Sequence, residues 1–326
     1  METLELNSNE FEVLKKQNFI SFESVPPKKG CICSSSCSLI DNPSDYEKAW
    51  LAISPHIFCI CLKDRADRFQ EACNVFHRYG LCRIVKFYRA ERPSLDEMEK
   101  LQNHGIKCRG LLGVWMSHYI ISLWAKLNGC EKALIFEDDV TFINQYMSPH
   151  KLTKIAKDMT RLPKNGWEIF YLGHIPFWGR PYTFDTRIFR VGSMMAHAYV
   201  LSQQGIAKLA SRDYLSDTII NKGKERGIDA WFFSDFVQYA CFPQIAVQSG
   251  SLTSNNGNTE RNLEKWFWEE VVPWGIDLHR DLTLLFEIIT YVIIPLLIFA
   301  ILIWCSKSKN RMLLLSSAFI VLPQLL

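Results

Sequence analysis

The chain has 326 residues, of which 48% are hydrophobic and 22% are charged, so its composition is that of a globular protein and excludes disorder throughout. Lys and Arg number 37 against 34 Asp and Glu, and a net charge of +3 is too small to indicate a nucleic-acid partner. The 11 cysteines are scattered through apolar segments and do not resemble the framework of a small disulfide-rich module.

Residues 1–50 form a polar leader that contains cysteines and serines. Cys31, Cys33 and Cys37 could hold a metal ion or be palmitoylated, but their spacing matches no standard zinc pattern. A flexible or loosely docked segment is the simpler interpretation.

Residues 51–278 are predicted to form the folded domain. Short apolar runs predict strands, and stretches with a period near 3.6 residues predict helices. In chain order the predicted elements are a strand at 56–62, a helix at 67–79, a strand at 83–90, a helix at 111–128, a strand at 132–136, a helix at 149–161, and strands at 168–172 and 197–201. This alternation is typical of an α/β domain with a largely parallel sheet, which binds ligands beyond the carboxyl ends of its strands.

Three consecutive acids, Glu137, Asp138 and Asp139, follow the strand predicted at 132–136. Adjacent carboxylates repel one another, and a bound divalent cation would relieve that repulsion. Mg²⁺ and Mn²⁺ favour carboxylate oxygens and often share their ligands with substrate phosphates. The alternative is an acidic loop that caps a following helix.

Seven short motifs, taken in their order along the chain, point to one protein family. They are ICLKDRADR at 60–68, FYRA at 87–90, GVWMSH at 113–118, ALIFEDDV at 133–140, WEIFYLG at 167–173, HAY at 197–199 and ID at 228–229. Across residues 55–255 the chain therefore resembles the family 25 glycosyltransferases, which include lipooligosaccharide β-galactosyltransferases and procollagen galactosyltransferases. Cys61, Asp64, Val114 and Glu168 depart from the family's usual residues, and the changes near Cys61 leave the donor-nucleotide preference open.

The resemblance implies a GT-A-type, Rossmann-like nucleotide-sugar-binding sandwich. It further implies a UDP-sugar donor, Mn²⁺ or Mg²⁺, and inversion at the anomeric carbon. The expected reaction is transfer of galactose or glucose to a hydroxyl of a glycan, glycolipid or protein. Inversion by direct displacement needs one carboxylate to take the proton of the acceptor hydroxyl.

Candidate site residues follow from these motifs. Asp139 and Glu137 are expected to bind the metal ion, and Glu137 and Asp138 to contact the donor. Asp229, beside an aromatic run that could stack on a sugar, is the expected general base, with Glu168 and Asp235 in reserve. A helix N-cap is the alternative for Asp229.

Other residues are expected to bind the nucleotide-sugar. They are Leu62, Arg65, Arg68, Ser117, His118 and His197. The arginines suit a diphosphate, because guanidinium pairs bidentately with phosphate oxygens. Ordinary surface pairs for the arginines, and ordinary core packing for the serine and the histidines, are the alternatives.

The C-terminal part of the chain is strongly apolar. Residues 288–305 contain no charge, and we expect a transmembrane helix over 283–306, followed by a second apolar segment at 312–326. The polar stretch 249–258 is expected to be a lid over the site or a linker toward this anchor. The N-terminus has no apolar stretch typical of a signal peptide, which favours a cytosol-facing catalytic domain, whereas the basic residues after 305 favour the opposite orientation.

Two other functional classes remain open at this point. A catalytically inactive relative could serve as a membrane-anchored adhesion or scaffold protein, although the acidic cluster argues against it. A nucleotidyltransferase also uses carboxylate-bound metal, but it usually has a glycine-rich phosphate loop after its first strand, and residues 62–68 contain no glycine.

Overall fold

The computed structural model describes residues 22–24, 44–95, 98, 108–182, 187–212, 220–221, 224–225, 227–248 and 296. The chain divides into two compact units, Met1–Glu269 and Glu270–Leu326, and all the described residues but Leu296 belong to the first. Within these described residues, no helix combines the length and the apolar character that a membrane crossing requires. Cys31, Cys33, Cys37, the stretch 249–258 and both predicted apolar C-terminal segments, apart from Leu296, lie outside the described residues.

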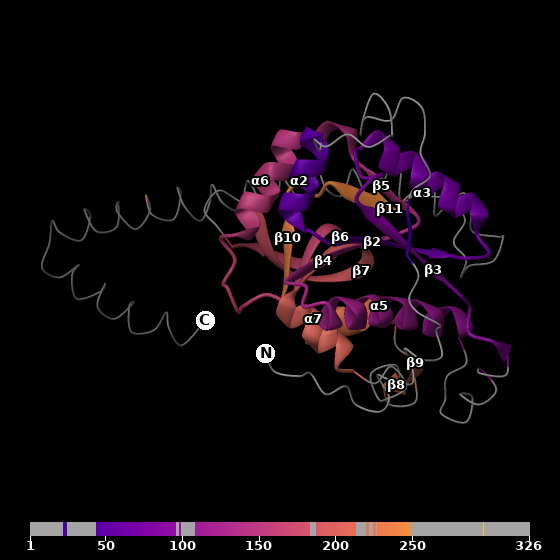
Figure 1. Ribbon diagram of the computed structural model, residues 1–326. Coiled ribbons are helices and arrows are strands. Elements are labelled where there is room, and N and C mark those ends of the chain that lie inside the picture. The colour runs from indigo at the N-terminus through magenta and orange to yellow at the C-terminus, as the bar shows by residue number, and fades with distance from the viewer. Residues whose placement is uncertain are drawn as a thin grey trace, which may run out of the picture. The chain divides into compact units, whose positions relative to one another are not determined.

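A mixed sheet forms the centre of the first unit (Figure 1). In the described part of the chain it has seven strands, ordered β1 (Phe22–Ser24), β3 (Val85–Ala90), β2 (Ile57–Leu62), β4 (Lys132–Glu137), β7 (Ile188–Ser202), β10 (Gln238–Cys241) and β6 (Ile169–Pro181). β2 pairs in parallel with both β3 and β4. β7 runs antiparallel to β4, β6 and β10, and β1 runs antiparallel to β3. Five of these seven strands therefore point in one direction.

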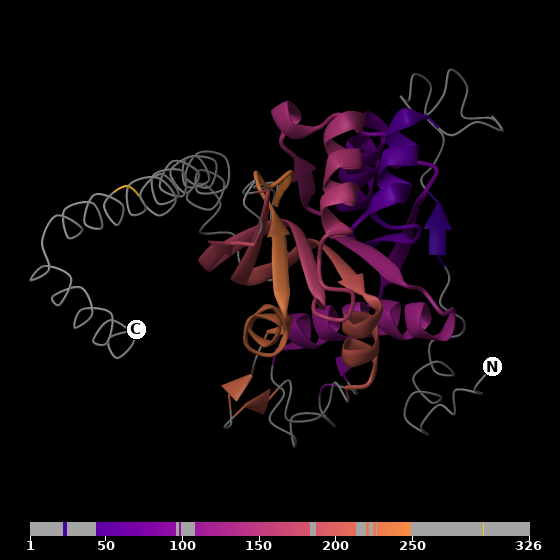
Figure 2. The same cartoon turned by 90° about the vertical axis from the view of Figure 1, so that its left-hand side faces the viewer.

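Helices cover both faces of this sheet. On one face lie α2 (Asp45–Ile53), α3 (Ala66–Arg78) and α6 (Pro149–Met159), and on the other lie α5 (Arg109–Leu127) and α7 (Gln203–Ala210), as Figures 1 and 2 show. The buried side chains of α8 (Ile228–Asp235) share a core cluster with those of α5 and α7. Two hydrophobic clusters result, one on each face, which is the layered burial that an α/β domain requires.

Local sequence accounts for several element boundaries. Ser44 and Glu47 form a capping box at the start of α2, and the Ser148 side chain caps α6 with Pro149 in the first turn. α5 ends before Gly129, whose φ of 63° is the left-handed conformation that glycine adopts most easily.

The predicted elements of the parallel part are confirmed, and other parts differ. The strand predicted at 197–201 belongs to a longer strand, β7, which runs antiparallel to β4 and forms a long hairpin with β6. Both β1 and most of α2 fall within the predicted leader 1–50, so elements of the folded unit begin before residue 51. Two small sheets complete the described fold: β5 (Val140–Phe142) with β11 (Ala246–Gln248), and β8 (Ile220–Asn221) with β9 (Lys224–Glu225).

Candidate active site

A pocket of about 270 Å³ lies at the carboxyl ends of β2, β3 and β4. The first turns of α3, α5 and α8 contribute further residues to its wall. The predicted site residues that line it are Leu62, Arg65, Arg68, Ser117, His118, Glu137, Asp138, Asp139 and Asp229. The fold thus brings together residues from four separate parts of the chain, at the sheet edge where α/β proteins bind ligands.

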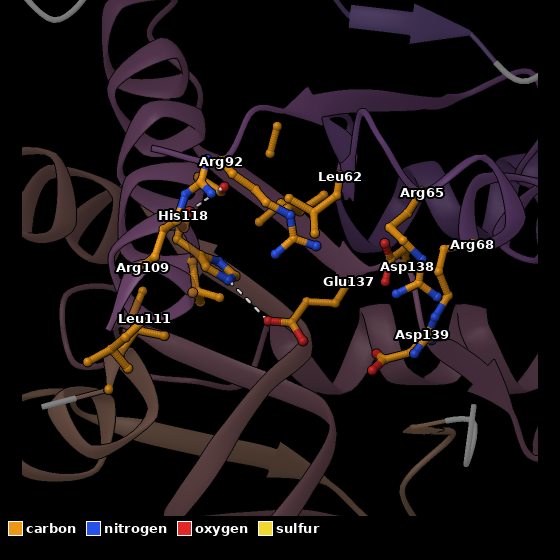
Figure 3. Close-up of a pocket in the computed structure, with 18 of the residues that line it drawn as sticks. Leu62, Arg65, Arg68, Arg92, Arg109, Leu111, His118, Glu137, Asp138 and Asp139 are labelled. Carbon is orange, nitrogen blue, oxygen red and sulfur yellow. Dashed lines mark hydrogen bonds and ion pairs between the residues drawn. The ribbon is translucent and has the colours of Figure 1, made fainter. Parts of the chain in front are cut away.

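The three consecutive acids do not point the same way. Glu137 ends β4 and extends toward His118, whereas Asp138 and Asp139, in the turn between β4 and β5, lie beside Arg65 and Arg68 (Figure 3). Burial raises the pKa of all three carboxyls, and repulsion from neighbouring acids raises the pKa of Glu137 and Asp139 further. The pKa of Glu137 reaches about 7.

Asp139 is the most confined of these acids. The residue is only 9% exposed, and its Oδ1 atom has no hydrogen-bond partner among the described residues. A buried carboxylate oxygen without a partner is costly. The arrangement therefore suits a cation that occupies the pocket when substrate binds.

Arg68 offsets part of the charge of this acidic cluster, and Arg65 adds to its effect on Asp138. Arg68 lies in the first turn of α3, is 3% exposed, and its charge lowers the pKa values of Glu137, Asp138 and Asp139. Arg65, at the N-cap of α3, forms two hydrogen bonds to Asp67, at 2.8 and 2.6 Å. This pairing holds the pKa of Asp67 well below its usual range.

A short series of hydrogen bonds connects Glu137 to the second core, the hydrophobic cluster between the sheet and α5, α7 and α8. His118 Nδ1 lies 2.6 Å from the Tyr199 hydroxyl, and His118 Nε2 lies 3.3 Å from Glu137 Oε1. Burial lowers the pKa of His118 to about 4, although the charge of Asp229 acts in the opposite direction, so the ring is neutral and carries one N–H. Because the ionised carboxylate of Glu137 can only accept, we assign that N–H to Nε2 in this form, and the Tyr199 hydroxyl then donates to Nδ1.

Asp229 enters the pocket from a different element. It is the second residue of α8, after the N-cap Gly227, and Gly227 and Ile228 line the pocket with it. The charge of Asp229 raises the pKa values of His118, Tyr171 and Tyr199, so this carboxylate lies in the same electrostatic environment as the His118 ring.

Three of the predicted candidates do not line this pocket. Glu168 precedes β6, and its carboxylate accepts hydrogen bonds from Lys208 Nζ at 3.0 and 2.9 Å and from the Val237 N–H at 2.8 Å. His197 is buried on β7, and burial lowers its pKa to about 4. Asp235 is the last residue of α8 and accepts a hydrogen bond from Ser234. Asp229, the expected general base, thus lines the pocket, and its two reserves, Glu168 and Asp235, do not.

Ser117 lines the pocket, but its hydroxyl donates to the Gly113 carbonyl at 2.7 Å, the helical packing role that was its alternative. Sequence reasoning missed Arg92, Arg109 and Gln248, which also line the pocket. Arg92 Nε lies 2.9 Å from Asp64 Oδ2, and Arg109 Nε donates to the Pro93 carbonyl. Arg92 follows the carboxyl end of β3 by two residues, so the strand-end rule that selected Glu137 could have found it.

The donor set fits a hard divalent cation. Carboxylate oxygens are the ligands such ions prefer, and Asp139 offers a buried oxygen that lacks a partner within the described chain. Among the described residues, no three His, Cys, Asp or Glu side chains converge into a complete metal site. An ion here would thus take few protein ligands and complete its shell with water and substrate phosphates, as Mg²⁺ usually does.

No protein-family model matches the chain. A protein of Aedes aegypti named "Glycosyltransferase 25 family member" is similar to it, with 28% identity over 134 residues. The similarity covers 36% of this chain and 21% of that protein, so the matched stretch spans about a fifth of the relative's length.

Proposed function

We propose that this chain is a metal-dependent, inverting glycosyltransferase that moves galactose or glucose from a UDP-sugar to a hydroxyl of a glycan, glycolipid or protein. The observation that carries the proposal is the pocket at the ends of β2, β3 and β4, where Asp138 and Asp139 meet Arg68 and Asp229 enters from α8. The similarity to a protein of glycosyltransferase family 25 supports the general class.

The donor diphosphate would lie between the acids and the arginines. Asp139 would hold Mn²⁺ or Mg²⁺, with Asp138 beside it, and that ion when bound supplies Lewis-acid stabilisation of the departing diphosphate. Arg68 and Arg65 would pair with phosphate oxygens. Leu62, at the end of β2, would contact the nucleoside.

His118 would orient Glu137 rather than bind the metal ion. Its Nε2–H donates toward Glu137 Oε1, 3.3 Å away, which leaves the remaining carboxylate oxygen to accept from a hydroxyl of the donor. Tyr199 fixes the ring from the other side. Glu137 was expected to bind the metal ion, and its direction toward His118 favours the donor-binding role instead.

Asp229 would act as the general base. Inverting transfer requires a carboxylate on the acceptor side of the sugar, placed to accept the hydroxyl proton as that oxygen attacks. Asp229 lines the pocket on a different element from the acids of β4, whereas Glu168 is engaged by Lys208 outside it. Proton abstraction therefore falls to Asp229.

The test is turnover of UDP-galactose and UDP-glucose by the full chain, with Mn²⁺ and with EDTA. We expect turnover only with metal, and at least a hundredfold lower transfer in Asp229→Asn with UDP affinity retained. Asp235→Asn, on the same helix but outside the pocket, is the matched control and should behave as wild type. Absence of both turnover and Mn²⁺-dependent UDP binding would instead favour the scaffold alternative.

We also propose that residues 283–306 anchor the chain in a membrane near its acceptor, with the catalytic domain facing the cytosol. A tether of this kind raises the effective concentration of a membrane-bound acceptor without any new contact. Protease treatment of sealed vesicles tests the orientation, because a protected catalytic domain would reverse it.

A further inference from the structure

A second cationic surface lies on α6, away from the active-site pocket. Lys154 and Lys157 are exposed on α6 and lie three residues apart, so they share one face of the helix, and the exposed Arg161 follows two residues after the helix ends. Arg187, just before β7, lies against the same face, with its Nη2 atom 3.0 Å from Asp158 Oδ1. These residues surround a hollow of about 450 Å³.

An apolar cavity adjoins this hollow. It has a volume of about 260 Å³ and shares Lys154, Asp158 and Arg187 with the hollow. Its apolar lining includes Ile155, Phe170, Phe242, Pro243 and Ile245. A charged recess and an apolar recess therefore lie next to each other and share three lining residues.

The charge of this region is strongly unbalanced. Asp158 is the one described carboxylate that lines either recess, and it is 4% exposed and already paired with Arg187 and, at 3.5 Å, with Arg161. Neither Lys154 nor Lys157 has an ion pair with a described residue. Two lysines thus face the solvent with nothing in this part of the chain to neutralise them.

We propose that this double recess binds an anionic phospholipid, with the phosphate headgroup among Lys154, Lys157 and Arg187 and the start of an acyl chain in the apolar cavity. Arginine pairs with phosphate through its planar fork, and lysine adds a compact positive charge. A free phosphate would leave the apolar cavity unused, and the apolar run at 288–305 places a membrane among the expected surroundings of the chain. No residue is shared with the active-site pocket, so the proposal stands apart from the proposed reaction.

The test uses the full chain in nonionic detergent with equal amounts of dioleoyl phosphatidic acid and dioleoyl phosphatidylcholine, followed by native mass spectrometry of the retained lipid. We expect at least a tenfold preference for phosphatidic acid. Lys154→Glu with Lys157→Glu should remove that preference. Lys86→Glu with Lys126→Glu reverses two charges on β3 and α5, outside both recesses, and should leave it unchanged.

Two further arms distinguish a lipid from its headgroup alone. Ile155→Phe fills the apolar cavity without changing charge and should lower retention of phosphatidic acid several-fold, with an unfolding curve recorded to confirm the fold. Millimolar inorganic phosphate should not displace the lipid. Equal retention of both lipids, displacement by phosphate, or equal loss in both double variants would overturn the proposal. Turnover of UDP-hexose should stay at the wild-type level in Lys154→Glu with Lys157→Glu, which separates this site from the active site.

Discussion

Asp139→Asn tests the physical basis of the candidate metal site through stability. In metal-free protein, this carboxyl is buried beside two other acids, and its Oδ1 atom has no hydrogen-bond partner among the described residues. Burial and the charges of Glu137 and Asp138 raise its pKa well above the usual value. The amide is nearly the same size but carries no charge, so the substitution removes the repulsion without opening a cavity.

The expected size of the effect follows from the repulsion that the amide removes, about 1 kcal/mol for each of the two neighbouring acids, Glu137 and Asp138. We take about 2 kcal/mol, which raises the melting temperature of a domain this large by roughly 4–8 °C. The sign depends on pH. An acid whose pKa is raised in the folded state destabilises that state once the pH exceeds its unfolded pKa, so the gain of the variant should be close to zero near pH 4 and larger at pH 8.

The assay is thermal unfolding of wild type and Asp139→Asn at pH 4 and pH 8, with EDTA and with 1 mM Mn²⁺. Mn²⁺ should raise the melting temperature of wild type and leave that of Asp139→Asn unchanged, and UDP-hexose turnover should be lost in the variant. Glu131→Gln, which removes an exposed acid before β4, is the control and should change little. A variant no more stable than wild type in EDTA at pH 8, or one stabilised equally by Mn²⁺, would refute the reasoning.

Three other predictions concern neighbouring residues. Tyr199→Phe removes the donor to His118 Nδ1 and should cost about 1–3 kcal/mol of stability and about tenfold in kcat. Tyr171→Phe is the control and should cost neither, because the Tyr171 hydroxyl has no hydrogen-bond partner among the described residues. Similar losses in both variants would contradict the hydrogen bonds assigned to His118. The free energy of unfolding of Glu137→Gln should match that of wild type near pH 4.5 and exceed it by on the order of 3 kcal/mol above pH 7 in EDTA, because folding raises the carboxyl pKa from 4.5 to about 7. Urea unfolding across this pH range measures the difference, and a difference that does not change with pH would contradict the prediction. Gly173→Ala should destabilise the protein by about 3 kcal/mol in the same assay, because the added Cβ would overlap the Ala246 carbonyl and the His197 ring. Stability equal to wild type would contradict this and show that the strand can move to make room.

Local pattern was sufficient where an element carries its own signal. The apolar runs that became β2, β3 and β4 are short, buried and bounded by polar residues, and their carboxyl ends place Leu62 and Glu137 in one pocket. α5 was predicted because its apolar residues continue to a glycine that can end the helix. These features depend on neighbours in the chain, so they can be read from it.

Non-local pairing was not visible in the same way. The hairpin of β6 and β7 contains three register shifts, and Pro176 and Gly179 interrupt the alternation that a strand normally shows. Sequence analysis keeps Glu168 in reserve behind Asp229 as the base, because sequence alone does not reveal which edge of the sheet a residue faces. Glu168 stands at the amino end of β6, and the pocket is formed at carboxyl ends.

The buried position of His118 does not exclude a role in the pocket. The ring is 1% exposed and packs within the second core, yet its Nε2 atom reaches a carboxylate that lines the pocket. A helix as apolar as α5 can deliver one polar atom to a site because the remaining polar atom of that ring is satisfied by Tyr199 from the next layer.

Electrostatic interactions connect the arginines and the acids of this pocket. Glu137, Asp138 and Asp139 follow one another in the sequence, and the positive charge of Arg68 lowers the pKa of each of them. A nucleotide diphosphate brought to the same acids without a divalent ion would meet repulsion from every carboxylate of β4 and its turn. Arg65 and Arg68, which we propose to pair with its phosphate oxygens, lie beside the same acids, and Arg92 and Arg109 line the pocket as well. A divalent ion held by Asp139 would offset that repulsion, so the proposed metal dependence and the predicted stability gain of Asp139→Asn rest on the same buried charges.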